Sequence, residues 1–222
     1  MRLVDLVLTE RADLLVISGD VFDRTADTAA AGRFFAAQMG RLAEAGVPVL
    51  VGAGNHDLAC PVATSYATNV HWFPAGAASS VVLGDLGVAV HGQGLPNPVE
   101  PSDLTAGFPA PVPGYLNLGV LHTSLDGLAS RTRCAPTSAE ALAARGYDYW
   151  ALGHVHQHRV VATDPWIVYA GTLQGRGPDE PGSKGATVIT AAYGAVTSVT
   201  HRELAVLRWE PIPVRRVGVL VD

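Results

Sequence analysis

The chain has 222 residues, of which 48% are hydrophobic and 16% are charged. This composition excludes a disordered chain, and the length suits one large domain or one and a half small ones. The formal net charge of −5 argues against broad, sequence-independent nucleic-acid binding. The charge is uneven, because residues 1–120 carry 5 basic and 11 acidic side chains whereas residues 121–222 carry 10 and 9.

The cysteines and the hydropathy of the sequence indicate the cellular compartment of the protein. Cys60 and Cys134 are far apart and in no spacing typical of a metal site. A disulfide between them stays open, but a reduced cytoplasmic protein is the simpler interpretation. No apolar stretch approaches the roughly 20 residues of a membrane span, and Asp5, Glu10 and Asp13 interrupt any signal-peptide layout. We therefore predict a cytoplasmic protein that makes no membrane contact.

The first fifty residues alternate helical and strand patterns. Apolar residues at helical spacing predict a helix at the very start, and the apolar run at 14–17 predicts a buried parallel strand. A second helix is predicted from residue 27 or 28 to about Glu44, where Gly46 ends it. A second buried strand follows at 48–52. The alternation is typical of an α/β fold.

Polar motifs follow both strands directly. Residues 18–23 read Ser-Gly-Asp-Val-Phe-Asp and include Asp20 and Asp23, and residues 54–57 read Gly-Asn-His-Asp. Carboxylates just past the end of a buried strand lie where α/β sheets place their chemistry. An asparagine oxygen can bind a metal, and His56 could bind a metal or donate a proton. The structural alternative is a polar turn or a helix cap.

The middle of the chain predicts short strands and one long loop. Runs at 70–73, 80–83 and 88–91 have the strand pattern, and residues 94–114 are rich in Pro and Gly. His71 and His91 lie within or at the end of these strands with no partner motif. We interpret both histidines as structural.

Two further strand ends carry histidines. A buried strand at 116–121 ends in His122, and a strand at 149–152 ends in the Gly-His-x-His motif with His154 and His156. Residues two apart in extended backbone point the same way, and neutral imidazoles suit a transition metal. Histidines satisfied by hydrogen bonds are the alternative. Between these strands, the capping box at 137–140 predicts a helix.

The remainder predicts strands at 159–161, 166–169, 186–190 and 196–200, with a hairpin turn at Tyr193-Gly194. The glycine-rich loop at 171–177 lacks Walker A spacing and its lysine, so we do not interpret it as a nucleotide loop. From Leu204 onward the pattern predicts short strand-like pieces.

Read in order, the four strand ends resemble the calcineurin-type metallophosphoesterases over nearly the whole chain. The stretches at 19–23, 121–124 and 169–177 are similar to the DNA-repair exonuclease branch, the SbcD-like nuclease subunits. The resemblance implies an α/β fold, a β-sandwich of two mixed sheets flanked by helices. We expect this metallophosphoesterase domain at residues 1–203, and the start of a C-terminal capping or partner-binding region at 204–222.

The resemblance also implies two divalent metal ions, Mn²⁺ in the first place, with Mg²⁺, Fe²⁺ or Zn²⁺ as alternatives. Asp20 would bridge both ions. Asn55, His122 and His154 would complete the shell of one ion, and His156 would bind the other. Two ions about 3.5–4 Å apart activate water and neutralise a phosphate, which is what phosphodiester cleavage needs.

Three further residues take catalytic or supporting roles by the same resemblance. His56 would be the general acid for the leaving oxygen, and Asp57 would hold its ring. Asp23 would orient a metal ligand.

One motif of this family, Asp-x-His on its first strand, has no match before Asp20. The first strand is therefore expected to be missing, which would leave the ion at His156 short of two ligands. We expect one tightly bound ion per chain and weak activity of this chain alone.

The leading hypothesis is a DNA exonuclease or endonuclease subunit acting in DNA repair. It implies DNA and an SMC-like ATPase subunit as partners, and it allows a homodimer. A phosphoesterase for a small nucleotide or phosphoprotein, and a non-catalytic scaffold, are the alternatives. Basic residues that flank the histidine motifs are candidates for DNA contact, with solvated surface charge as their alternative: Arg131, Arg133, Arg159, Arg176 and Lys184.

Overall fold

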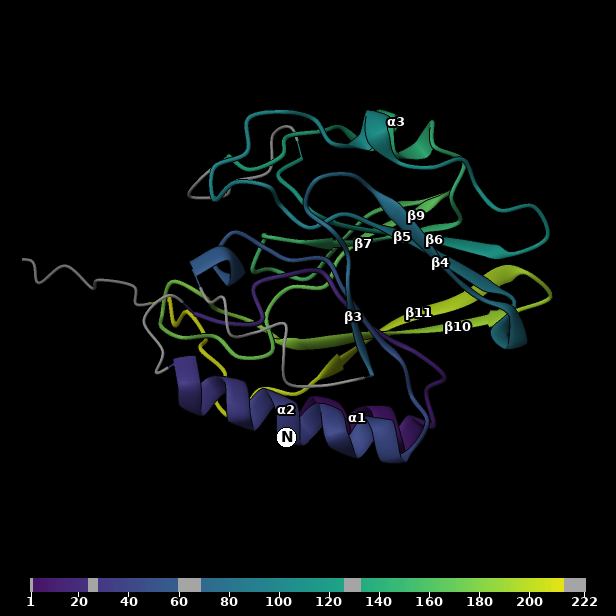
Figure 1. Ribbon diagram of the computed structural model, residues 1–222. Coiled ribbons are helices and arrows are strands. Elements are labelled where there is room, and N and C mark those ends of the chain that lie inside the picture. Colours follow the sequence, from purple (N-terminus) through teal and green to yellow (C-terminus); the bar gives the residue numbers. More distant parts are fainter. Residues whose placement is uncertain (1, 24–27, 60–68, 126–132, 214–222) are drawn as a thin grey trace, which may run out of the picture.

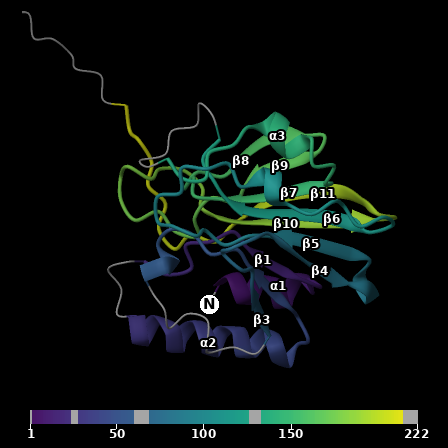
Figure 2. The ribbon, with the colours of Figure 1, turned by 45° about the horizontal axis from the view of Figure 1, so that its top comes forward.

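The computed structural model describes residues 2–23, 28–59, 69–125 and 133–213. Strands form the middle of the molecule, with α1 and α2 on one side and α3 on the other (Figure 1 and Figure 2). Within the described ranges, no helix has the length and apolar character needed to cross a membrane.

The first sheet contains three parallel strands in the order β1-β2-β3. Its strands and the two neighbouring helices are α1 (Arg2–Glu10), β1 (Leu15–Ile17), α2 (Thr28–Glu44), β2 (Val49–Val51) and β3 (Val70–Trp72). The helices and the sheet share one buried apolar cluster that includes Val7, Leu42 and Val49. Burying a side chain of this size stabilises a fold by about 1.5–3 kcal/mol, so this cluster anchors both helices on the sheet.

The second sheet contains six strands in the order β4-β5-β6-β7-β9-β8. They are β4 (Ser79–Leu83), β5 (Val88–Gly92), β6 (Leu116–His122), β7 (Tyr149–Gly153), β8 (Arg159–Thr163) and β9 (Trp166–Tyr169). The four inner strands are parallel, and the edge strands β4 and β8 are antiparallel to their neighbours. Every residue of β6 is buried, as expected for a central parallel strand.

The remaining elements complete the fold. They are η1 (Asp57–Ala59), η3 (Gly84–Leu86), η4 (Thr105–Gly107), α3 (Ala139–Ala143) and the hairpin strands β10 (Gly185–Ala192) and β11 (Ala195–Glu203). The side chain of Ser138 caps α3 by accepting a hydrogen bond from the backbone N–H of Ala141. Tyr193 and Gly194 turn the hairpin with positive φ angles of 55° and 76°, as a two-residue hairpin turn requires.

The two sheets pack face to face through a shared cluster that contains Leu50 of β2 and Val120 of β6, with Val199 of the hairpin against it. The predicted α/β fold with flanking helices is confirmed. In detail, the first sheet is purely parallel rather than mixed, because the strands described in it are joined by long crossover connections. The missing strand and the boundary after residue 203 stay predictions.

Two further predictions concern the C-terminal segment and the cysteines. The predicted strand-like pieces do not form in residues 204–213, where no strand is assigned. Cys134 is a buried free cysteine, and Cys60 lies outside the described residues.

Candidate metal centre

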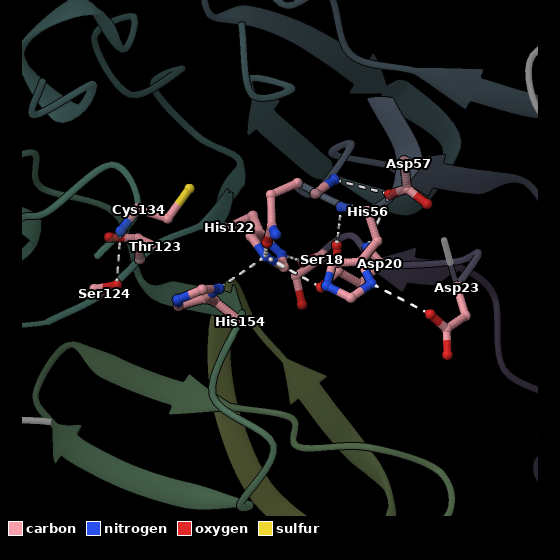
Figure 3. A network of polar contacts seen from close by, with 12 residues as sticks. Ser18, Asp20, Asp23, His56, Asp57, His122, Thr123, Ser124, Cys134 and His154 are labelled. Atoms are coloured by element: carbon pink, nitrogen blue, oxygen red, sulfur yellow. Dashed lines mark hydrogen bonds and ion pairs between the residues drawn. The ribbon is translucent and has the colours of Figure 1, made fainter. Parts of the chain in front are cut away.

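Four polar motifs gather at one edge of the sheets because the strands that carry them are parallel. Ile17 at the end of β1 is in register with Val51 at the end of β2. In the second sheet, His122 at the end of β6 is in register with Gly153 at the end of β7. The residues after these ends therefore meet, as Figure 3 shows for the side chains around His122.

His122 is the centre of this cluster and is only 1% exposed. Its Nδ1 lies 2.9 Å from the carbonyl oxygen of Ser18. Its Nε2 lies 3.0 Å from Oδ1 of Asn55 and 3.5 Å from Oδ2 of Asp20. Nδ1 of His154 lies 3.2 Å from the same Nε2 (Figure 3). The structure thus brings together all four residues predicted for the first ion.

Three glycines allow the loops to approach His122 so closely. A Cβ at Gly19 or Gly54 would overlap the imidazole of His122 and the facing loop. A Cβ at Gly153 would collide with the carbonyl of Ser18. Each of the three motifs therefore requires its glycine for a steric reason.

Two of the clustered residues adopt unusual backbone conformations. Asp20 and His154 have φ angles of 54° and 94°. Positive φ costs free energy for a residue with a Cβ, and such strain is concentrated at functional sites.

The protonation of His122 follows from its contacts. Burial lowers its pKa to about 4, and the nearby charge of Asp20 offsets only part of this effect. The ring is therefore neutral, and because a carbonyl oxygen can only accept, its proton is on Nδ1 and is donated to Ser18. The lone pair of Nε2 then faces the oxygens of Asn55 and Asp20. Three acceptor atoms that face one another favour a cation between them.

The donor set fits a divalent ion in chemistry and in spacing. Ligand atoms that share an ion at about 2.0–2.2 Å lie roughly 3 Å from each other, and the contacts around Nε2 measure 3.0–3.5 Å. In the described part of the chain, no three His, Cys, Asp or Glu side chains are grouped as a complete metal site. Around His122, Nε2 and the oxygens of Asn55 and Asp20 face one another at the spacing that a shared ion requires.

His56 lies beside the cluster and next to Asp23. Its Nδ1 is 3.6 Å from Oδ1 of Asp23, and the other oxygen of Asp23 pairs with the guanidinium of Arg176 (Figure 3 shows the first pair). The backbone N–H of His56 donates to Oδ1 of Asp20 at 2.9 Å. This arrangement leaves Nε2 of a partly exposed imidazole facing away from its carboxylate.

Asp57 does not hold His56, and that prediction is corrected here. Its carboxylate is buried and accepts three backbone N–H groups, from Asp20 at 2.8 Å, Phe22 at 3.0 Å and Gly54 at 2.8 Å. Burial raises the pKa of Asp57 to about 6, against the opposing effect of these N–H donors. Asp57 thus ties the loop after β1 to the loop after β2, and Asp23 takes the position beside His56.

His156 contacts a carboxylate that the sequence patterns did not indicate. Its Nδ1 lies 2.6 Å from Oε1 of Glu180. Glu180 sits 24 residues later, in the loop between β9 and β10, and no strand end or spacing marks it. The carbonyl of His156 accepts a hydrogen bond from Nζ of Lys184 at 3.0 Å.

The five candidates for DNA contact have different surroundings. Arg133 and Arg159 are exposed, and Arg176 is ion-paired with Asp23. Lys184 is only 3% exposed, so its ammonium supports the backbone of His156 instead of facing a bound polymer. That prediction is corrected, and Arg131 lies outside the described residues.

The two histidines interpreted as structural do not contact the cluster in the described structure. His91 is fully buried, where Ser80 Oγ lies 2.7 Å from its Nδ1 and Asn117 Oδ1 lies 3.0 Å from its Nε2. His71 is exposed and packs edge-on against Phe73. These contacts are those of histidines that pack in the fold and do not bind the metal.

Comparisons with known proteins identify chains that are similar to this one. The chain is 28% identical over 217 residues to the uncharacterized metallophosphoesterase YhaO of Bacillus subtilis (strain 168), a match that takes in 94% of this chain and 52% of YhaO. The chain thus spans about half the length of that relative. A crystal structure of TT1561 of Thermus thermophilus is 15% identical, with a TM-score of 0.42 over 77% of this chain and 81% of the other.

The family assignment rests on the sequence model of the calcineurin-like phosphoesterases, which matches residues 1–158. This match covers most of the chain and includes all four motifs. The chain therefore belongs to the calcineurin-like phosphoesterase family, a family of hydrolases that typically bind divalent metals.

Proposed function

We propose that this protein is a metal-dependent phosphodiesterase, with DNA as its substrate. The observation that carries the hydrolase assignment is the group of acceptor atoms around His122. Oδ1 of Asn55 and Oδ2 of Asp20 both face the lone pair of Nε2. A divalent cation would be held by these three residues and His154.

Different residues of the chain would bind the metal and donate the proton in phosphodiester cleavage. A bound ion would activate water and neutralise charge on the phosphate. Asn55 and the histidines are neutral ligands, so the site keeps the positive charge that attracts a phosphate. His56 stands at the edge of the cluster, and Asp23 orients it through Nδ1. Its Nε2–H is then placed to protonate the leaving oxygen, a step in which general acids contribute about 10²–10⁴-fold.

DNA as the substrate is supported by the stretches that resemble the SbcD-like nucleases and by the exposed cations Arg133 and Arg159. The same resemblance supports Mn²⁺ as the metal, an SMC-like ATPase as partner and a role in DNA repair. A small nucleotide or a phosphoprotein is the alternative substrate. A scaffold that binds a partner without cleaving it is the alternative of another class.

The test measures hydrolysis by the purified chain with Mn²⁺, Mg²⁺, Fe²⁺ or Zn²⁺. Substrates are single- and double-stranded DNA, bis(p-nitrophenyl) phosphate as a generic diester, and p-nitrophenyl phosphate as a monoester. We expect Mn²⁺-dependent cleavage of the diester and of DNA. Cleavage of the monoester alone would contradict the diesterase assignment, and bound metal without hydrolysis of any substrate would indicate a scaffold.

The role of His56 is tested with His56→Ala and the matched control His71→Ala, which removes an exposed histidine outside the cluster. His56→Ala should lower kcat by about 10²–10⁴-fold while the Mn²⁺ content, measured by mass spectrometry, stays at the wild-type value. Loss of metal in this variant would make His56 a ligand. An unchanged kcat would remove it from the mechanism.

A further inference from the structure

The loop between β9 and β10 reaches the site through Glu180. The side chain of Glu180 is 15% exposed, and both of its oxygens are engaged. Oε1 lies 2.6 Å from Nδ1 of His156, and Oε2 accepts the backbone N–H of Arg176 at 2.9 Å. An ionised carboxylate can only accept hydrogen bonds, so Nδ1 of His156 must carry a proton.

This contact decides which ring nitrogen of His156 can bind a cation. A neutral imidazole carries one proton, and with that proton on Nδ1 the lone pair is on Nε2. A carboxylate on the far side of a metal-binding histidine fixes its tautomer and its ring orientation and raises its basicity. Glu180 is in the position to do all three for His156.

The same loop also fixes the backbone of His156. Its carbonyl accepts hydrogen bonds from Nζ of Lys184 at 3.0 Å and from the backbone N–H of Thr172 at 3.2 Å. Lys184 is 3% exposed, and a buried ammonium that donates to a carbonyl holds it firmly because the alternative is an unpaired charge. Ring and backbone of His156 are thus both positioned by residues 172–184.

A second connection runs from Glu180 to His56. Glu180 accepts the backbone N–H of Arg176, and the guanidinium of Arg176 pairs with Asp23, which lies 3.6 Å from His56. One carboxylate therefore contacts His156 directly and supports the residue that holds Asp23 beside His56.

We propose that Glu180 is a positioning residue that keeps the proton of His156 on Nδ1 and presents Nε2 to a divalent cation, an inference that rests on the proposed function. The cation meant here is the one that His156 binds. Loss of Glu180 should first change the tautomer of His156, through it the affinity for the cation, and through that affinity the turnover.

The experiment compares Glu180→Ala and Glu180→Gln with the control Glu210→Gln, which changes an exposed carboxylate on the C-terminal segment. The first readout is the tautomer of His156 in metal-free protein, by ¹⁵N NMR of the imidazole at about pH 8, above the ordinary pKa of histidine. The second is Mn²⁺ affinity, by titration, together with paramagnetic broadening of the His156 signals. The third is hydrolysis of bis(p-nitrophenyl) phosphate.

Wild type and Glu210→Gln should show the Nδ1–H tautomer. Glu180→Ala should shift His156 toward Nε2–H and weaken the Mn²⁺ that broadens its signals by about 10–100-fold, the usual effect of losing such a partner. Glu180→Gln keeps one acceptor oxygen for Nδ1–H, so it should retain part of the Nδ1–H tautomer and part of the Mn²⁺ affinity. It also provides the test if the alanine variant does not fold.

An unchanged tautomer in both variants overturns the proposal, as does a changed tautomer with unchanged Mn²⁺ affinity. If the wild-type chain binds Mn²⁺ at His156 but hydrolyses nothing, the proposed function fails while the positioning role is still decided by the first two readouts. If the wild-type chain binds no Mn²⁺ at His156, the presentation of Nε2 to a cation is overturned.

Discussion

The carbonyl oxygen of Ser18 accepts the Nδ1–H of His122 at 2.9 Å and at the same time lies against Gly153. One backbone atom after β1 thus sets the tautomer of a histidine at the end of β6 and limits the size of the residue at the end of β7. The contact joins the two sheets at the edge where the polar motifs meet.

Gly153→Ala should destabilise the protein because its methyl group would collide with the Ser18 carbonyl. Overpacking of a buried position costs about 1–3 kcal/mol, and displacement of the loop should also weaken Mn²⁺ binding. The control is Gly40→Ala near the C-terminal end of α2, where a Cβ meets nothing within 4 Å. It should stabilise by about 0.5–1 kcal/mol, since alanine is the better helix former. Urea unfolding measures both, and equal effects would contradict the steric argument.

Asp57→Ala should lower the free energy of unfolding more than an ordinary surface substitution. It removes the acceptor of three backbone N–H groups, and an unsatisfied buried donor costs about 1–3 kcal/mol. Asp85→Ala is the exposed control and should stay within about 0.5 kcal/mol. If Asp57→Ala instead leaves stability unchanged and lowers only kcat, Asp57 acts on His56 and the structural role is wrong.

The buried histidines should make the protein less stable as the pH falls below the ordinary pKa of histidine, whereas Asp57, whose pKa burial raises to about 6, acts in the opposite direction. Burial lowers the pKa of His91, and a hydrogen bond to Asn117 only partly offsets this. His91 therefore becomes protonated near pH 6.5 in the unfolded chain but only at a lower pH in the folded chain. Between these two pH values, protonation favours the unfolded chain. His122, His158 and His201 act in the same direction because burial lowers their pKa values too.

The contribution of His91 is isolated with His91→Gln, which cannot titrate. Urea unfolding in the presence of EDTA, at about pH 7.5 and about pH 5.5, should show a smaller pH-dependent loss in the variant than in the wild type. Its stability at the higher pH should also be lower, because the contacts to Ser80 and Asn117 are lost. Equal losses in both proteins would show that His91 does not titrate in this way.

DNA affinity should depend on Arg159, an exposed residue at the start of β8, close to the Gly-His-x-His motif. Arg159→Ala should weaken binding to all sequences alike and reduce the salt slope of log K by about 1, as expected when one phosphate contact is lost. Arg41→Ala is the control, because Arg41 is in the last turn of α2, away from the strand ends, and pairs with Asp5. Fluorescence anisotropy over a salt series measures both. An unchanged slope would place Arg159 on the solvated surface.

Local pattern was sufficient for the strands, the main helices and the places where polar residues follow them. The apolar runs before Asp20, Asn55, His122 and His154 predict buried parallel strands, and parallel strands end at one edge. These features depend on residues adjacent in the chain, so the sequence by itself determined the fold class and the convergence of those four residues.

The tertiary structure alone decided which carboxylate lies next to which histidine ring. Asp57 is next to His56 in the chain, yet its carboxylate turns to backbone N–H groups of another loop, and Asp23 takes its place. Glu180 reaches His156 from 24 residues away, and Lys184 is buried beneath it. Side-chain direction and burial arise from contacts between segments distant in sequence, and neither periodicity nor spacing carries that information.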